Sequence, residues 1–212
     1  MGFEGGRTVS HWRDQQTMSA RFDELPDFAL DRLGPLVRLL GNVGNFHDAA
    51  RWIADLPYGR NSRPIDYRLV PIEQRGTCTT KHAFLAALSH EQGCPLQLLV
   101  CFFDMSGQTH PAVAETLARA GLASIREAHC LIGFEGKIFD LTGLPPSDPL
   151  PEYSDFARLP LDQLDQKQAL HRGALAIWAE QKRISMPVQR LWSIREQCIR
   201  DLAGDKRQEE RS

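Results

Sequence analysis

Cysteine, histidine and aspartate occur along this chain in an order that suits covalent catalysis. Cys78 stands where an apolar helical pattern begins, and His129 and Asp140 follow in two later apolar segments. A cysteine attacks as its thiolate, a nearby imidazole can take the thiol proton, and a carboxylate on the far ring nitrogen orients the imidazole. The pattern therefore predicts an enzyme in which Cys78 is the nucleophile, His129 the base and Asp140 the orienting residue.

The helix that begins at Cys78 is itself suited to an anionic sulfur. Residues 77–92 form the clearest helical pattern of the chain, and Gly93 stands where a capping glycine is expected. Unpaired N–H groups and the helix dipole favour negative charge in the first turn of a helix. The N–H of Cys78 could therefore also bind the oxyanion of a reaction intermediate. The apolar stripe of this helix consists of Ala83, Phe84, Ala87 and Leu88.

A β-hairpin is expected to bring His129 and Asp140 to one face of a sheet. Two apolar segments, 128–134 and 137–141, flank a two-residue turn of Glu and Gly. In a hairpin with that turn, His129 faces Thr142, and Asp140 is its diagonal neighbour on the same face. Diagonal neighbours lie about 7–8 Å apart at Cα, a gap that side chains can close. An odd-length loop or a bulge would reverse this arrangement.

These elements together resemble the transglutaminase-like superfamily, whose members are relatives of papain-type cysteine proteases. The resemblance covers residues 74–143 and implies that Cys78, His129 and Asp140 are nucleophile, base and orienting residue. It also implies that the helix with the cysteine packs against an antiparallel sheet. The motifs are Gly76-Thr77-Cys78 opening a helix, Gly93-Cys94-Pro95 before a strand, Ala128-His129 on a strand and Asp140-Leu141-Thr142 on the next.

The chain also departs from that family. Cys130 follows the histidine, where the family often has an aromatic residue, and the calcium-binding loop of animal crosslinking enzymes is missing from the sequence. The flanks, residues 1–70 and 145–212, match no part of the family. The substrate therefore remains open at the level of sequence.

Two further residues near Cys78 could assist the chemistry. Gln74 could donate a hydrogen bond to an oxyanion, although its short spacing from the cysteine favours a loop residue. His82 lies one turn after Cys78 on the same helix face, so it could be a second base. His82 could also join Cys78 and His129 in a metal site, but a further ligand at a convincing spacing is missing. We therefore expect neither a metal nor a cofactor.

Composition and charge favour a globular protein of the cytoplasm. The 212 residues are 42% hydrophobic and 25% charged, with a net charge of −2 and no basic stripe with interleaved aromatics, so nucleic acid is not an expected partner. The longest strongly apolar run, residues 98–103, is too short for a membrane span, and the N-terminus lacks the apolar stretch of a signal peptide. The five cysteines have no disulfide-like spacing, which favours a reducing compartment.

The expected fold is α+β, with a papain- or transglutaminase-like core and helical additions at both ends. Residues 1–20 are expected to form a flexible arm, residues 21–204 a single transglutaminase-like domain with its core at about 66–144, and residues 205–212 a polar tail. Helices are predicted at 27–40, interrupted at Gly34-Pro35, and at 47–56, 77–92, 111–120, 161–184 and 187–203. The other predicted segments are a doubly buried strand from residue 98, an extended segment at 67–72, a loop at 57–64 and an irregular stretch at 142–159.

The expected function is thiol acyl chemistry on a peptide, a protein or a small amide. Water as the acceptor gives a protease or amidase, and an amine gives a transferase. No feature of the sequence selects an amine, which slightly favours hydrolysis. The alternative is a catalytically silent binding or scaffolding module of the same fold. The remaining cysteines (94, 101, 130 and 198) and two tryptophans, Trp178 and Trp192, are expected to serve packing.

Overall fold

A four-stranded antiparallel sheet organises the part of the chain that the computed structural model describes, residues 21–32, 34–94, 96–145 and 149–204. The strand order is β3-β2-β1-β4, and six α-helices surround the sheet within these residues, so the fold class is α+β. The expected arm and tail lie outside the described residues. The elements are α1 (Phe46–Asp55), α2 (Leu69–Glu73), α3 (Cys78–Glu91), β1 (Gln97–Ser106), α4 (Ala114–Arg119), β2 (Ser124–Phe134), β3 (Lys137–Phe139), β4 (Ser154–Arg158), α5 (Gln166–Gln181) and α6 (Val188–Leu202).

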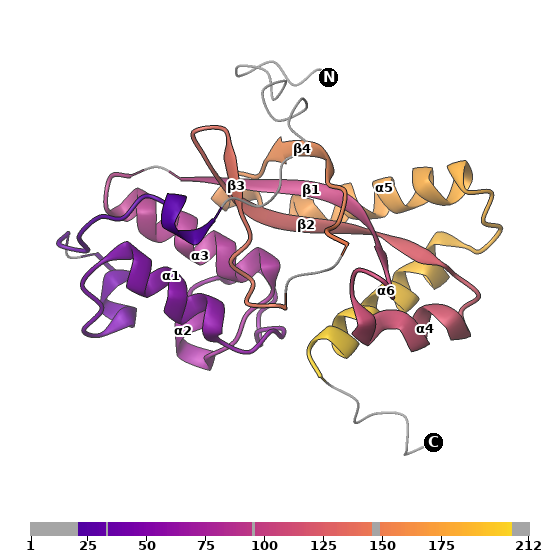
Figure 1. Ribbon diagram of the computed structural model, residues 1–212, viewed down its shortest axis with the longest axis horizontal. Helices are drawn as coiled ribbons and strands as arrows, with labels where there is room; N and C mark the ends of the chain where they lie inside the picture. The colour runs from indigo at the N-terminus through magenta and orange to yellow at the C-terminus, as the bar shows by residue number, and fades with distance from the viewer. Residues whose placement is uncertain (1–20, 33, 95, 146–148, 205–212) are drawn as a thin grey trace.

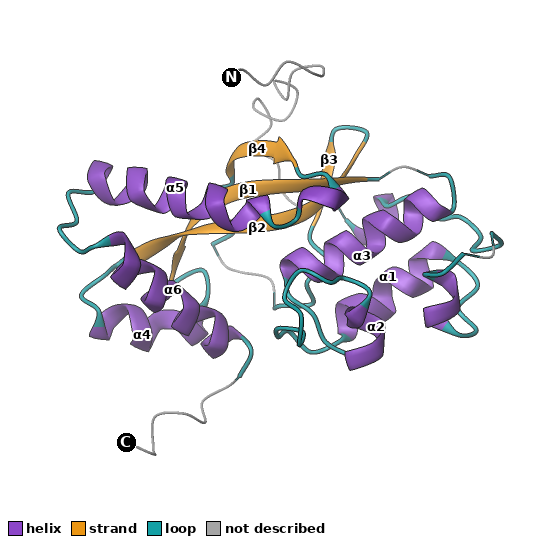
Figure 2. Ribbon diagram, turned by 180° about the vertical axis from the view of Figure 1, so that it is seen from behind, coloured by secondary structure: helices purple, strands orange, loops and turns teal. Residues whose placement is uncertain are grey.

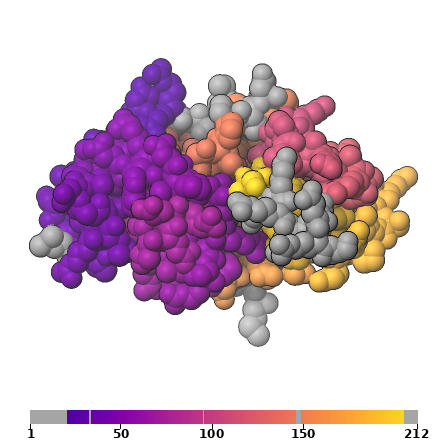
Figure 3. All heavy atoms as spheres, turned by 90° about the horizontal axis from the view of Figure 1, so that it is seen from below, coloured from indigo at the N-terminus to yellow at the C-terminus, as the bar shows by residue number. Residues whose placement is uncertain are grey.

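Helices lie against both long central strands. Figure 1 shows α1, α2 and α3 below one half of the sheet, with α4 and α6 below the other half. Helix α5 runs along the opposite side of β1 and β2 and comes to the front in Figure 2. Seen from below, the N-terminal half of the chain and the C-terminal helices occupy opposite sides of the molecule (Figure 3).

Alternate residues of β1 enter two different hydrophobic clusters. Leu98 and Val100 pack with α1 and α3, whereas Phe103 and Met105 pack with α4, α5 and α6. Successive side chains of a strand point to opposite faces, so both faces of β1 are covered. This confirms the doubly buried strand that its unbroken apolar run predicted.

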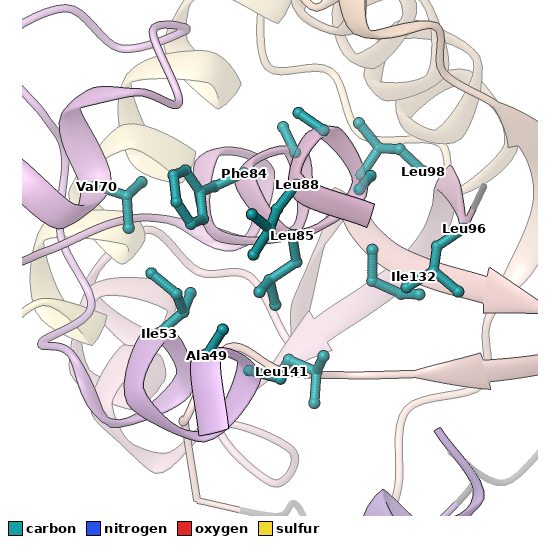
Figure 4. Close-up of a cluster of buried hydrophobic side chains, with 14 of the residues drawn as sticks. Ala49, Ile53, Val70, Phe84, Leu85, Leu88, Leu96, Leu98, Ile132 and Leu141 are labelled. Atoms are coloured by element: carbon teal, nitrogen blue, oxygen red, sulfur yellow. The ribbon is translucent and has the colours of Figure 1, made fainter. Parts of the chain in front are cut away.

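The hydrophobic cluster that contains Leu98 and Val100 fixes the position of α3. Figure 4 shows Phe84, Leu85 and Leu88 of α3 between side chains of α1 and side chains of the sheet. These three residues and Ile53 of α1 are fully buried. Burying one such side chain stabilises the fold by about 1.5–3 kcal/mol. The location of Cys78, the first residue of α3, therefore follows from the packing of that helix.

The β2–β3 hairpin has the predicted register, with Phe134 opposite Lys137. Its turn residues Glu135 and Gly136 have φ angles of 46° and 79°, the left-handed values that a tight two-residue hairpin turn requires. Strand β3 ends at Phe139, two residues before the predicted boundary. The next residue, the expected orienting aspartate, therefore lies in a turn rather than in the strand.

The helix predicted at 27–40 is wrong except for a short 3₁₀ turn, Val37–Leu40. Ala29 instead forms an isolated bridge with Asn45. The carboxylate of Glu91, on α3, accepts hydrogen bonds from the backbone N–H groups of residues 36 and 37, both at 3.0 Å. A side chain distant in sequence thus satisfies backbone donors that local periodicity assigns to a helix.

Two other predictions are corrected. The segment expected to be extended at 67–72 contains α2, whose Pro71 lies within the first turn of the helix, where proline is tolerated. The stretch 142–159, expected to be irregular, contains the edge strand β4, which pairs with β1 across a register shift. The loop at 57–64 and the other predicted helices are present, although α5 begins only at Gln166.

Candidate active site

Helix α3 begins at Cys78 because the flanking threonines cap it reciprocally. Thr80 Oγ1 accepts a hydrogen bond from the N–H of Thr77 at 3.0 Å, and the Thr77 side chain caps the N–H of Thr80. The buried Asn61 accepts from the Thr80 hydroxyl at 3.1 Å and donates to the carbonyl of Arg75 at 2.9 Å. Cys78 is thus held in the first helical position, where its N–H has no partner within the helix.

The loop after α1 lies beside Cys78. Gly59 donates to the carbonyl of Gly76 at 3.1 Å, and Gly76 donates to the carbonyl of Pro57 at 3.2 Å. This pairing places Tyr58 next to Cys78, and both residues line the same cavity. Sequence reasoning missed Tyr58, because only the backbone pairing of two loops brings it to the thiol.

The structure brings His129 and Asp140 together, as the hairpin predicted. The Nε2 atom of His129 lies 2.9 Å from Oδ2 of Asp140. The other oxygen of Asp140 accepts from the N–H and the hydroxyl of Thr142, at 3.0 and 2.8 Å. Tyr153 stacks on the imidazole with centroids 5.7 Å apart and planes 7° apart, and Phe103 meets it edge-on at 6.0 Å. The ring is therefore held on its faces and at one nitrogen.

This pair favours a charged imidazole. Burial lowers the pKa of His129, but the charges of Asp140 and Cys78 raise it well above its ordinary value. Burial raises the pKa of Asp140, whereas the charge of His129 and the hydrogen bond between them hold it well below its usual range. Because a carboxylate only accepts, Nε2 carries the proton. The Nδ1 atom is left to exchange a proton with the thiol.

Cys78 is 3% exposed and lies beside a buried lysine that the sequence did not reveal as part of the site. Lys167, in the first turn of α5, donates to Thr79 Oγ1 at 2.7 Å and to Sγ of Cys78 at 3.6 Å. Burial raises the pKa of Cys78, but the charges of Lys167 and His129, with a hydrogen bond from His129, bring it down to about 5. The sulfur is therefore a thiolate at neutral pH.

The pKa values of the other four cysteines are shifted in the opposite direction, upward. Cys101, Cys130 and Cys198 are buried, and burial raises the pKa of each thiol. Cys94 is half-buried, and its pKa is also raised by burial. All five cysteines are free thiols. A lowered pKa therefore distinguishes Cys78 from every other cysteine of the chain.

His82 links α3, the helix that begins at Cys78, to the turn that carries Asp140. Its Nδ1 bonds the carbonyl of Cys78 at 2.8 Å, and its Nε2 accepts from the N–H of Leu141 at 2.7 Å. Burial lowers the pKa of His82 to about 4, so the ring is neutral. Both ring nitrogens are occupied by backbone groups, which leaves neither for a second base or a metal. Across the described residues, no group of three or more His, Cys, Asp or Glu side chains could hold a metal ion.

Gln74 lies exposed at the end of α2 in a left-handed conformation with φ 51°. It is not among the residues that line the cavity at Cys78. This placement agrees with the loop role that its spacing favoured and gives no support to a role in binding an oxyanion.

Cys78 opens onto a cavity of about 280 Å³ between the loop after α1, the first turns of α3 and α5, and one side of α6. Arg60 and Glu196, both lining residues, form an ion pair at 2.5 Å that joins the loop to α6. His129 is not a lining residue, so a molecule in the cavity meets the thiol first. Other lining residues include Tyr58, Lys167, His171, Trp192 and Arg195. Trp192 thus lines this cavity and also packs against the hydrophobic cluster of α4, α5 and α6.

A buried ion pair joins this cavity to the sheet. Arg195 donates from Nε to the Oε2 atom of Glu127 at 2.6 Å, and its Nη2 contacts Oε1. Burial raises the pKa of Glu127, but Arg195 and then His171 lower it to about 2. His171 bonds the carbonyl of Arg126 at 2.9 Å, and burial lowers its pKa to about 4. Arg195 is therefore neutralised by Glu127, which leaves Lys167 and His129 as the buried cations beside the sulfur.

No helix among the described residues has both the length and the apolar character needed to cross a membrane. Comparisons with protein-family models, with curated proteins and with solved structures found no match to this chain. The resemblance to the transglutaminase-like superfamily therefore rests on the sequence motifs, and what the site does must follow from its own contacts.

Proposed function

We propose that this protein cleaves an amide bond by nucleophilic attack of Cys78, in a papain- or transglutaminase-like core. The observation that carries the proposal is the thiol's environment, in which Lys167 and His129 lower its pKa to about 5 against the effect of burial. Only the thiolate form of a cysteine is a strong nucleophile. A packing cysteine has a raised pKa instead, as Cys101 and Cys130 do.

The groups around the sulfur support both halves of the reaction. The thiolate of Cys78 forms a bond to the carbonyl carbon, and an electron pair moves to the carbonyl oxygen. The backbone N–H of Cys78 and the dipole of α3 favour that negative charge. His129 gives its Nδ1 proton to the leaving nitrogen as the C–N bond breaks, while Asp140 holds the ring. Water then attacks the thioester and gives a proton to His129, and the thiolate leaves.

We propose water as the acceptor, because no feature of the sequence selects an amine. The cavity beside Cys78 supports a substrate that presents an amide to the sulfur, either the end of a peptide or a small amide. The free thiols agree with a reducing cytoplasm as the place of action.

Alkylation tests the nucleophile first. We expect iodoacetamide at about pH 6 to modify Cys78 and to leave Cys94 unmodified, because only the first is ionised at that pH. Peptide mass mapping reports both sites in one sample. The variant Cys94→Ala should keep the fast reaction, and Cys78→Ser should lose it. A Cys78 that reacts no faster than Cys94 would contradict the proposal.

Acyl transfer is tested with p-nitrophenyl acetate. We expect a burst of p-nitrophenol and a protein mass increased by one acetyl group on Cys78, followed by slow hydrolysis of the thioester. His129→Ala should slow hydrolysis of the acetyl-enzyme by about 10²-fold or more, because no general base is left to take the proton of the attacking water. A reactive thiolate that never forms an acyl-enzyme would instead favour the silent binding module.

A further inference from the structure

We propose that Lys167 is the permanent counter-ion of the Cys78 thiolate, so that the nucleophile stays ionised whether or not His129 carries a proton. The catalytic use of this pairing rests on the proposed function, but the pairing itself does not. In this arrangement Lys167 holds the charge of the site and His129 moves the proton.

Lys167 reaches the nucleophile from a distant part of the chain. Its residue is 8% exposed, and its Nζ donates to Thr79 Oγ1 at 2.7 Å and to Cys78 Sγ at 3.6 Å. Both acceptors belong to the first turn of α3, whereas the lysine begins α5. The ammonium group is therefore directed at the start of the helix that carries the nucleophile.

A buried ammonium group needs an anion or a full set of acceptors, because desolvating a charge costs several kcal/mol. The two carboxylates of the site already have partners, because Arg195 binds Glu127 and His129 binds Asp140. Within the described residues, the ion pairs found include none between Lys167 and a carboxylate. The sulfur of Cys78 is the remaining group that can supply the negative charge.

Lys81, the other buried lysine, has neutral carbonyl acceptors in place of an anion. Lys81 donates to the carbonyl oxygens of Ala54, Leu56 and Thr142 at 3.0, 2.5 and 2.7 Å. Burial lowers the pKa of Lys81 to about 8, although the charges of Asp55 and Asp140 act to raise it. Burial also acts to lower the pKa of Lys167, but Cys130, then Cys78 and then Glu127 raise it above its ordinary value. The opposite direction at Lys167 agrees with an anion beside it.

The other ionisable groups around the sulfur supply no further positive charge beside it. From the loop after α1, Tyr58 is a neutral phenol, because burial and then the charge of Cys78 raise its pKa. Within α3, His82 is neutral, and from β2 Cys130 is a neutral thiol. From α6, Arg195 is taken by Glu127. Lys167 and His129 are therefore the two cations that act on Cys78; the charge of Lys167 lowers its pKa more than the charge of His129 does, and His129 adds a hydrogen bond.

This division of roles has a consequence for both reaction steps. After His129 gives its proton to the leaving group, the ring is neutral and can accept a proton from water at once. Lys167 remains charged, so it favours the second oxyanion and the departure of sulfur as a thiolate. A site that depended on the imidazolium alone would lose this stabilisation whenever the ring is neutral.

The test follows the ultraviolet absorbance of the thiolate as a function of pH, with Cys78→Ser as the blank. We expect the wild-type midpoint at about 5. Lys167→Met should raise the midpoint by about 1–3 units, and Lys167→Arg should keep it low. His129→Ala should leave most of the thiolate in place, whereas His129→Ala with Lys167→Met should remove it at neutral pH. The matched control is Lys182→Met at the far end of α5, where the lysine is exposed beside Asp104 and should not affect the midpoint.

A Lys167→Met variant with the wild-type midpoint would overturn the proposal, as would a His129→Ala variant that loses the thiolate completely. Circular dichroism spectra would identify a variant that does not fold, and Lys167→Gln, which keeps a donor for Thr79 but removes the charge, then takes the place of Lys167→Met with the same expected rise in the midpoint. The proposed function fails in a different way. If p-nitrophenyl acetate leaves no acetyl group on Cys78 while the midpoint still depends on Lys167, the pairing stands and the acyl chemistry does not.

Discussion

Asp140 controls the protonation of the site from a position in which its carboxylate is itself fixed. Thr142 donates two hydrogen bonds to Oδ1, so Oδ2 is directed to the imidazole of His129. The carboxylate raises the pKa of His129, and the imidazolium in turn lowers the pKa of Cys78. One side chain in a turn thus affects a sulfur on another element through a single ring.

We predict that Asp140→Asn lowers the pKa of His129 toward its ordinary value, because the amide has no charge to stabilise the imidazolium. Hydrolysis of the acetyl-enzyme should slow by about 10²-fold or more, because the ring that takes the proton of water is no longer held by a carboxylate. Nuclear magnetic resonance of the His129 ring as a function of pH measures the first effect. Asp155→Asn is the matched control, because this exposed aspartate pairs with Arg126 on the sheet. An unchanged His129 titration in Asp140→Asn would show that the carboxylate does not orient the base.

The turn that follows β3 is the element on which the position of Asp140 depends. Lys81 on α3 binds the carbonyl of Thr142 and the carbonyls of Ala54 and Leu56 at the end of α1. Gly143 continues the turn with φ +72°, and a Cβ atom there would lie 1.8 Å from the carbonyl oxygen of Ala54. Helices α1 and α3 and this turn are therefore packed as one unit.

We predict that Gly143→Ala destabilises the protein by about 2–5 kcal/mol, the sum of a positive-φ penalty and an overpacked backbone contact. Gly121→Ala is the control, because Gly121 has φ +69° with open space around it, and should cost only about 1–2 kcal/mol. Urea unfolding gives both values. Equal destabilisation in the two variants would rule out the steric contact.

Sequence patterns predict those elements whose structure depends on contacts between neighbouring residues. The cap of α3, the helix at 47–56 and the hairpin register follow from neighbouring residues, and so does the meeting of His129 with Asp140. The failures at 27–40 and at β4 have a different cause, because Glu91 and β1 supply those hydrogen bonds from distant segments. Lys167 could not be identified for the same reason, since no spacing indicates that it faces a thiol 89 residues earlier.

At the scale of the whole molecule, a buried ion pair connects the C-terminal helices to the sheet near the site. Arg195 on α6 binds Glu127 on β2, and both side chains are at most 10% exposed. Glu127 and His129 belong to the same strand, so this contact also determines where the C-terminal helices meet the cavity. The C-terminal helices, which matched no part of the resembled family, thus supply Lys167, Trp192 and Arg195 to the cavity.

We predict that Glu127→Gln destabilises the protein by about 3–5 kcal/mol near neutral pH, because Arg195 is left as a buried charge without its partner. The folded-state pKa of Glu127 is lowered to about 2 from 4.5. Its contribution to stability is therefore present above about pH 4.5 and is lost as the pH falls toward 2. Urea unfolding across this range should show a shallower acid loss in Glu127→Gln than in wild type. Glu24→Gln, at the exposed pair with Lys137, should keep the wild-type slope, and an equal slope in Glu127→Gln would contradict a charged Glu127.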